Sequence, residues 1–134
     1  MGIEKGLRGE QQMVVGRWDL ASVMGNIGAE VLSTHMVVLL MELAARNAIE
    51  GRLPEGTITV GTLISIRHFA ATPLGLKVRA VACLREIRGR TLVFDVAAYD
   101  EFEKIAEGHN EQLMVSADTF LERTRRKRPG EEES

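Results

Sequence analysis

The stretch Val31–Glu50, VLSTHMVVLLMELAARNAIE, decides the fold of this chain. Its middle leaves almost no polar face, because apolar residues recur at Met36, Val37, Val38, Leu39, Leu40, Met41, Leu43, Ala44, Ala45, Ala48 and Ile49. A helix that is apolar all round is expected to be buried. The run is too interrupted to span a bilayer, which requires roughly 20 apolar residues. One carboxylate, Glu42, lies inside it, where a charge is costly unless it is paired, protonated or used.

The ends of this helix carry recognisable signals. Ser33 and Thr34 are both of the types that cap a helix N-terminus, so we expect the helix to begin near them. Gly51, reinforced by Pro54, predicts the end of the helix. The preceding segment, residues 19–28, holds two glycines and an asparagine, and we expect a loop or a short helical turn there.

After the helix the apolar pattern changes to a period of two, which is typical of half-buried strands. A strand is predicted over residues 57–68. One face is expected to carry Ile58, Val60, Thr62, Ile64, Ile66 and His68. Gly61 interrupts this strand and indicates a bulge or a close approach by another group. Further strands are predicted over 76–85, 92–99 and 104–116, and a first strand over 13–18.

These elements predict one strand, one buried helix and an antiparallel meander of four long strands. Long strands need a cover for their apolar face, and the helix is the available cover. A single helix wrapped by a curved antiparallel sheet is the α+β arrangement called the hot-dog fold. We expect a loose lead-in over residues 1–12, one domain over 13–122 and a charged tail over 123–134. The tail is expected to be solvated, with contact to phosphate or nucleic acid as the alternative.

The composition limits the classes of function. The length of 134 residues fits one domain, and the formal net charge of -2 gives no general attraction to nucleic acid or anionic lipid. We therefore expect neither a nucleic-acid nor a membrane partner. The single cysteine, Cys83, cannot form an internal disulfide, which suits a cytoplasmic location. The histidines and Cys83 show no metal-ligand spacing, so no metal is expected.

Three polar side chains stand at positions where apolar ones are expected. Thr34 lies at the helix entry, Glu42 within the helix and His68 at the end of a strand face. Imidazole exchanges protons near neutral pH, and a carboxylate in an apolar site suits a general base or nucleophile. The free N–H groups of a helix N-terminus can stabilise a developing oxyanion. Together these groups have the chemistry to cleave an activated acyl group.

Each of the three also has a plain structural interpretation. Thr34 could simply cap the helix, Glu42 could pair with Arg46 one turn on, and His68 could be a satisfied core histidine. An ideal helix moreover separates Thr34 and Glu42 by roughly 12 Å along its axis. The two share a site only if Thr34 folds over or if an extended substrate runs between them.

Three stretches resemble hot-dog thioesterases related to fluoroacetyl-CoA thioesterase: VLSTHMVVLLMELAA, TVGTLISIRHFAATPLG and EIRGRTLVFDVAAYDEFEKIAEG, over about residues 20–116. The resemblance implies that Thr34, Glu42 and His68 form the catalytic set. It also implies that the Gly61 backbone lies against the acyl thioester, with Ser33 and Thr62 as further substrate-binding residues. A homodimer with two sites near its interface is implied as well.

The chain departs from the family pattern at three places. His35 stands where a proline usually follows the catalytic threonine. The last strand often reads Gly-x-His-x-Arg, whereas Asn110 and Gln112 occupy the His and Arg positions here. The loop over residues 25–30 lacks the aromatic residue associated with fluoroacetate selectivity, so fluoroacetyl-CoA is not predicted as the substrate.

The sequence therefore predicts an acyl-CoA thioesterase that acts on a small or medium acyl-CoA. No cofactor is expected, since CoA is part of the substrate. The alternative is a hot-dog module that binds an acyl-CoA without cleaving it.

Overall fold

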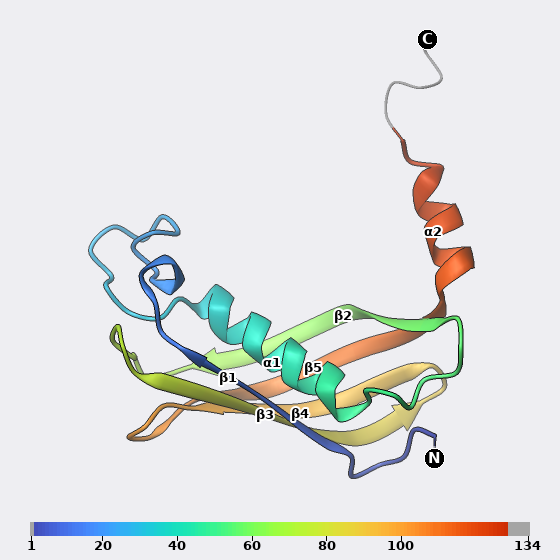
Figure 1. The fold of residues 1–134 in the computed structure, drawn as a ribbon, viewed down its shortest axis with the longest axis horizontal. Helices are drawn as coiled ribbons and strands as arrows, with labels where there is room; N and C mark the ends of the chain where they lie inside the picture. The colour runs from blue at the N-terminus through green and yellow to red at the C-terminus, as the bar shows by residue number, and fades with distance from the viewer. Residues whose placement is uncertain (1, 129–134) are drawn as a thin grey trace.

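The computed structural model describes residues 2–128, which form one sheet, a helix that packs on it and a second helix that projects from it (Figure 1). In chain order the strands and α-helices are β1 Arg8–Val14, α1 Thr34–Ala48, β2 Thr57–His68, β3 Lys77–Arg88, β4 Thr91–Tyr99, β5 Lys104–Ser116 and α2 Ala117–Arg125. A short 3-10 helix, η1 Arg17–Asp19, follows β1. The bounds predicted for β2 and β5 are confirmed.

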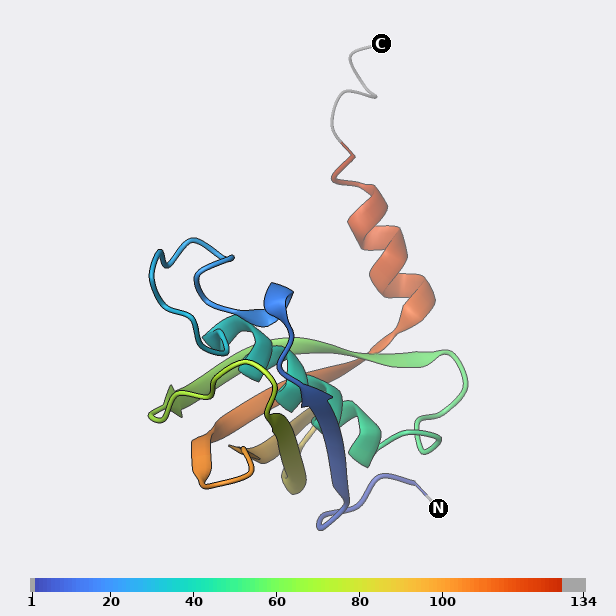
Figure 2. The ribbon, with the colours of Figure 1, turned by 60° about the vertical axis from the view of Figure 1, so that its left-hand side comes forward.

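The sheet has five antiparallel strands in the order β1-β3-β4-β5-β2. The meander therefore runs only through β3, β4 and β5. The prediction of a four-strand meander is wrong, because β2 pairs with β5 and not with its successor β3. This crossover makes β2 an edge strand, and the sheet curls around α1 as expected for a hot-dog fold (Figure 2).

Helix α1 packs closely against the sheet through its small residues. A Cβ added at Gly9 of β1 would overlap the backbone of Ala44 and Ala48, so only glycine allows this approach. The helix is not buried all round, contrary to the prediction, because Leu39 is 44% exposed and His35 is also exposed. One side of α1 thus has no cover from residues 2–128.

Strand β2 contains a bulge at the glycine that the sequence singled out. Its register with β5 shifts between Gly61 and Leu63. The shift exchanges the two faces of the strand, since side chains alternate with a period of two. Thr59 consequently faces the inner side and bonds to β5, whereas Ile58 is 38% exposed. The single inward face predicted for 58–68 therefore holds only for the part after the bulge.

Both ends of the chain are more regular than predicted. Residues 8–12 belong to β1 and pair with β3, so the prediction of a loose lead-in is wrong for them. Residues 15–18 were expected to continue a strand, but residues 15 and 16 lead into η1 and residues 17 and 18 belong to it. Helix α2 crosses the predicted boundary at 122 and has no buried residue. Residues 129–134 of the predicted tail lie outside the described residues.

Candidate active site

Thr34 and His68 meet where the N-terminus of α1 passes the end of β2. A hydrogen bond joins Thr34 Oγ1 to His68 Nδ1 at 2.8 Å. Thr34 is free for this contact because Ser33 is the N-cap: its Oγ accepts a hydrogen bond from the Met36 backbone N–H at 3.2 Å. The alternative that Thr34 caps the helix is therefore excluded.

The His68 imidazole is poised to exchange protons. Its Nε2 is buried and has no hydrogen-bond partner among the described residues, so His68 is not a satisfied core histidine. Burial lowers the pKa of His68 below the usual value for a histidine, and the backbone of Ala70 offsets only part of this shift. The ring is consequently neutral near pH 7 and able to accept a proton.

Glu42 lies further along α1, where the helix faces the bulge of β2. Its Oε2 lies 2.8 Å from the position of a Cβ added at Gly61, so the carboxylate rests on the glycine backbone. The Asn110 side chain donates its Nδ2–H to the same oxygen at 3.4 Å. Glu42 is half-buried, and no ion pair with Arg46 occurs within residues 2–128.

The structure thus brings the predicted residues together in two pairs. Thr34 meets His68, and Glu42 meets Gly61, but in the described chain no hydrogen bond connects one pair with the other. Thr34 is the first residue of α1 and does not fold back over it. The eight-residue offset on a helix separates the pairs by roughly 12 Å.

The two other predicted binding residues have structural tasks. Ser33 is 1% exposed, and its hydroxyl serves the helix cap. Thr62 lies in the bulge and donates its hydroxyl to the Glu111 carbonyl oxygen at 3.2 Å. Ser33 therefore fixes the start of α1 and with it the position of Thr34.

Sequence reasoning missed the role of the buried amides on β5. Asn110 and Gln112 are both 0% exposed, and the Gln112 Nε2 donates to the Asn110 Oδ1 at 2.8 Å. The signal was the unusually polar run over residues 107–112 in a strand that faces the helix. A polar side chain on a buried face requires partners, and here the partners lead to Glu42.

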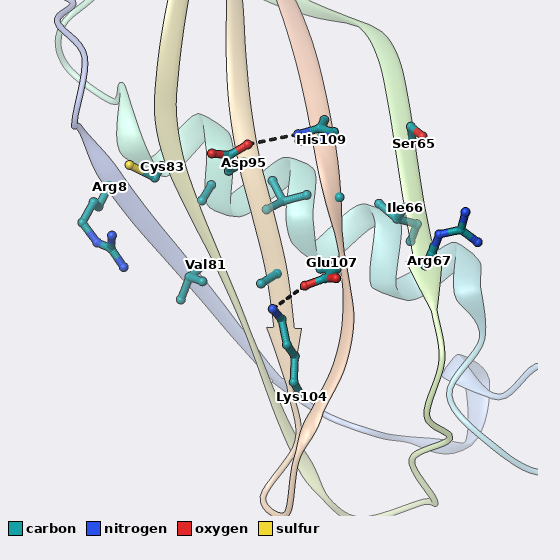
Figure 3. Close-up of a pocket in the computed structure, with 14 residues that line it drawn as sticks. Arg8, Ser65, Ile66, Arg67, Val81, Cys83, Asp95, Lys104, Glu107 and His109 are labelled. Atoms are coloured by element: carbon teal, nitrogen blue, oxygen red, sulfur yellow. Dashed lines mark hydrogen bonds and ion pairs between the residues drawn. The ribbon is translucent and has the colours of Figure 1, made fainter.

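The outer face of the sheet carries a second cluster of reactive side chains (Figure 3). It borders an open hollow of about 720 Å³, lined among others by Ser65, Cys83, Asp95 and His109. His109 Nδ1 lies 3.0 Å from Asp95 Oδ1, but the same oxygen accepts a 2.9 Å hydrogen bond from Arg85 Nε. These side chains are about half exposed, which is typical of a solvated charge network.

Within residues 2–128, no group of three or more His, Cys, Asp and Glu side chains is arranged to hold a metal ion. None of the helices in this range has the length and apolar character needed to cross a membrane.

The chain is similar to proteins of known activity. The family model described as fluoroacetyl-CoA-specific thioesterase (FlK) matches residues 15–118. The fluoroacetyl-CoA thioesterase of Streptantibioticus cattleyicolor is 38% identical over 100 residues, which are 75% of this chain and 72% of that protein.

Solved structures agree with this similarity. The fluoroacetyl-CoA thioesterase FlK superposes with a TM-score of 0.88 at 31% identity, covering 96% of this chain and 100% of that one. A thioesterase superfamily member from Thermus thermophilus superposes with a TM-score of 0.86 at 29% identity, and the match covers 92% of each chain. A hot-dog-like protein from Thermanaerovibrio acidaminovorans has a TM-score of 0.87 at 23% identity, and the match covers 96% of this chain and 95% of that one. At this identity the match supports the fold alone. The fold and these matches together show that the chain belongs to the fluoroacetyl-CoA-specific thioesterase family.

Proposed function

We propose that this protein hydrolyses the thioester of a small or medium acyl-CoA. The observation that carries the proposal is the Thr34–His68 hydrogen bond, with the other imidazole nitrogen buried and unpartnered in the described chain. A relative supports the substrate class, because a variant of FlK was solved in complex with acetyl-CoA. We keep the acyl group general, since the loop over residues 25–30 has no aromatic side chain.

We propose Thr34, Glu42 and His68 as the catalytic residues. Hydrolysis adds one water across the thioester: an oxygen bonds to the carbonyl carbon, the C–S bond breaks and CoA leaves as the thiol. Glu42 either activates the water as a general base, or attacks the carbonyl carbon to form an acyl anhydride that the water then hydrolyses to free Glu42. His68 moves the proton to the leaving sulfur, and Thr34 with the α1 N-terminus stabilises the oxyanion.

A homodimer resolves the separation between the two pairs. Strand β2 is an edge strand with Ile58 and Leu63 exposed, and α1 exposes Leu39. Such an edge is a template for pairing with another chain. We propose that β2 pairs with the β2 of a second copy around a two-fold axis. Antiparallel pairing reverses the direction of α1 and β2 in that copy, so that Glu42 of the partner subunit approaches the Thr34–His68 pair.

The proposal also covers the cellular location of the protein and the absence of a cofactor. We place the protein in the cytoplasm, where acyl-CoA is available and a lone thiol such as Cys83 stays reduced. The chemistry above uses protein groups and water, and CoA enters as part of the substrate.

The test is a free-thiol release assay across acyl-CoA substrates from acetyl to long-chain. The intact protein is expected to release CoA, and Glu42→Gln to lower kcat by about 10²- to 10⁴-fold. Glu107→Gln, which removes an exposed carboxylate on the outer face of β5, is the matched control and should retain activity. A folded protein that binds acyl-CoA without releasing thiol would instead be the non-catalytic binding module.

A further inference from the structure

The inner face of β5 buries two amide side chains, one of which contacts Glu42. Asn110 and Gln112 are both 0% exposed. Burial of an amide is costly unless its donors and acceptors are satisfied. Their hydrogen bonds therefore reveal what the two side chains support.

These hydrogen bonds form a chain that starts at the bulge of β2. The Thr59 hydroxyl donates to Gln112 Oε1 at 2.8 Å, and Gln112 Nε2 donates to Asn110 Oδ1 at 2.8 Å. Asn110 Nδ2 then donates to the Leu63 carbonyl oxygen at 3.0 Å and to Glu42 Oε2 at 3.4 Å. The chain thus ends with a donor on the candidate catalytic carboxylate.

The direction of this chain is fixed by its partners. The Leu63 carbonyl can only accept, so the nitrogen of the Asn110 amide must face it. The Asn110 oxygen consequently faces Gln112 and requires the nitrogen of that amide. A flip of either amide would place two acceptors or two donors against each other.

The same carboxylate oxygen is held from two sides. Glu42 Oε2 receives the Asn110 donor and faces Gly61, where an added Cβ would come within 2.8 Å. No partner of Oε1 occurs in the described part of the chain, so this oxygen is available to the substrate or to water. The amides are neutral, and they orient the carboxylate without cancelling its charge as a guanidinium would.

We propose that Asn110 and Gln112 are positioning residues, an amide relay that orients Glu42 for thioester hydrolysis. The inference rests on the proposed function. It assigns to this chain a neutral support for the Glu42 carboxylate.

The experiment is a double-mutant cycle followed by thiol release. Asn110→Leu removes the donor at similar size and is expected to lower kcat by about tenfold or more, with KM changed less than about twofold. In a Glu42→Gln background the same substitution should cost nothing further, because the group that it orients is gone. His109→Leu, the neighbouring exposed position on the outer face, should leave kcat unchanged.

Gln112→Met provides a second, milder variant if Asn110→Leu fails to fold. It keeps Asn110 but removes the donor that holds the Asn110 oxygen, and it should lower kcat about three- to tenfold. An unchanged kcat in both variants, an effect on KM alone, or an equal loss in the Glu42→Gln background would overturn the relay. Failure of the proposed function is distinct, because the unsubstituted protein would then release no thiol.

Discussion

Gly61→Ala should damage the reaction while leaving the fold intact. The added Cβ would lie 2.8 Å from Glu42 Oε2 and 3.7 Å from its Cδ. Ordinary van der Waals contact begins at 3.4 Å, so the carboxylate must retreat by at least 3.4 − 2.8 = 0.6 Å. The end of a flexible side chain makes this move at little cost, so the backbone of β2 need not shift.

The size of the effect follows from the displacement. A misplacement of about 1 Å in a catalytic group costs about 10²-fold in rate. We therefore expect Gly61→Ala to lower kcat by about 10- to 100-fold, or roughly 1.4–2.8 kcal/mol in activation free energy. The melting temperature should stay close to that of the parent protein, because alanine is at least as compatible with a strand as glycine.

The assay is thiol release under substrate saturation, with thermal melting measured in parallel. Ser65→Ala is the control on the same strand, since Ser65 is exposed on the outer face. If Gly61→Ala keeps full kcat, the contact between the Gly61 backbone and Glu42 does not position the reacting carboxylate, and the reasoning fails.

Three further predictions concern the surroundings of the site. Ser33→Ala removes the N-cap hydroxyl that accepts a hydrogen bond from the Met36 N–H. It should lower the free energy of unfolding by about 1 kcal/mol, measured by urea titration. An unchanged urea midpoint would refute the role of the cap. Burial holds the pKa of His68 below 6.5, so the unfolded chain binds more protons than the folded one just below that pH. The free energy of unfolding should therefore fall as pH falls through this window. His68→Asn should lose that component of the pH dependence. Identical pH profiles of the two proteins would contradict the lowered pKa of His68. Thr72→Val removes the hydroxyl that donates to Asp100 Oδ2 at 2.9 Å and should destabilise the fold by about 0.5–1.5 kcal/mol in calorimetry. A variant as stable as the parent would show that this half-buried contact contributes nothing.

The local patterns predicted the elements well because each signal had one physical cause. The apolar run with Ser33 before it and Gly51 after it matches α1, which spans Thr34–Ala48. The period of two predicted β2 and β5 with their observed bounds. Gly61 indicated a bulge or a close approach, and it makes both.

The relations between distant elements were harder to predict. Strand order depends on which strand edges meet after folding. The sequence of β2 or β5 alone therefore does not indicate that the two strands pair. The bulge exchanged the faces of β2, which a strict alternation cannot anticipate. Strand β1 was missed over residues 8–12 because their polar side chains show little contrast, as fits an edge strand with one solvated side.

The residues of the candidate site were predicted from the sequence, but their positions relative to one another were not. Thr34 and His68 meet as the resemblance implied, whereas Glu42 lies with Gly61 about two turns further along α1. The amide partners of Glu42 were also missed, because the role of a buried polar side chain on a strand depends on the groups that it contacts, and the sequence alone does not give these contacts.

A complementation assay with two inactive variants tests the shared site most directly. Glu42→Gln and His68→Ala are purified separately, mixed in equal amounts under conditions that allow subunit exchange, and assayed for thiol release. If Glu42 of one subunit serves the Thr34–His68 pair of the other, each mixed dimer regains one intact site, and about a quarter of the parent activity returns. Activity that stays at the level of the separate variants, despite demonstrated exchange, would contradict the account.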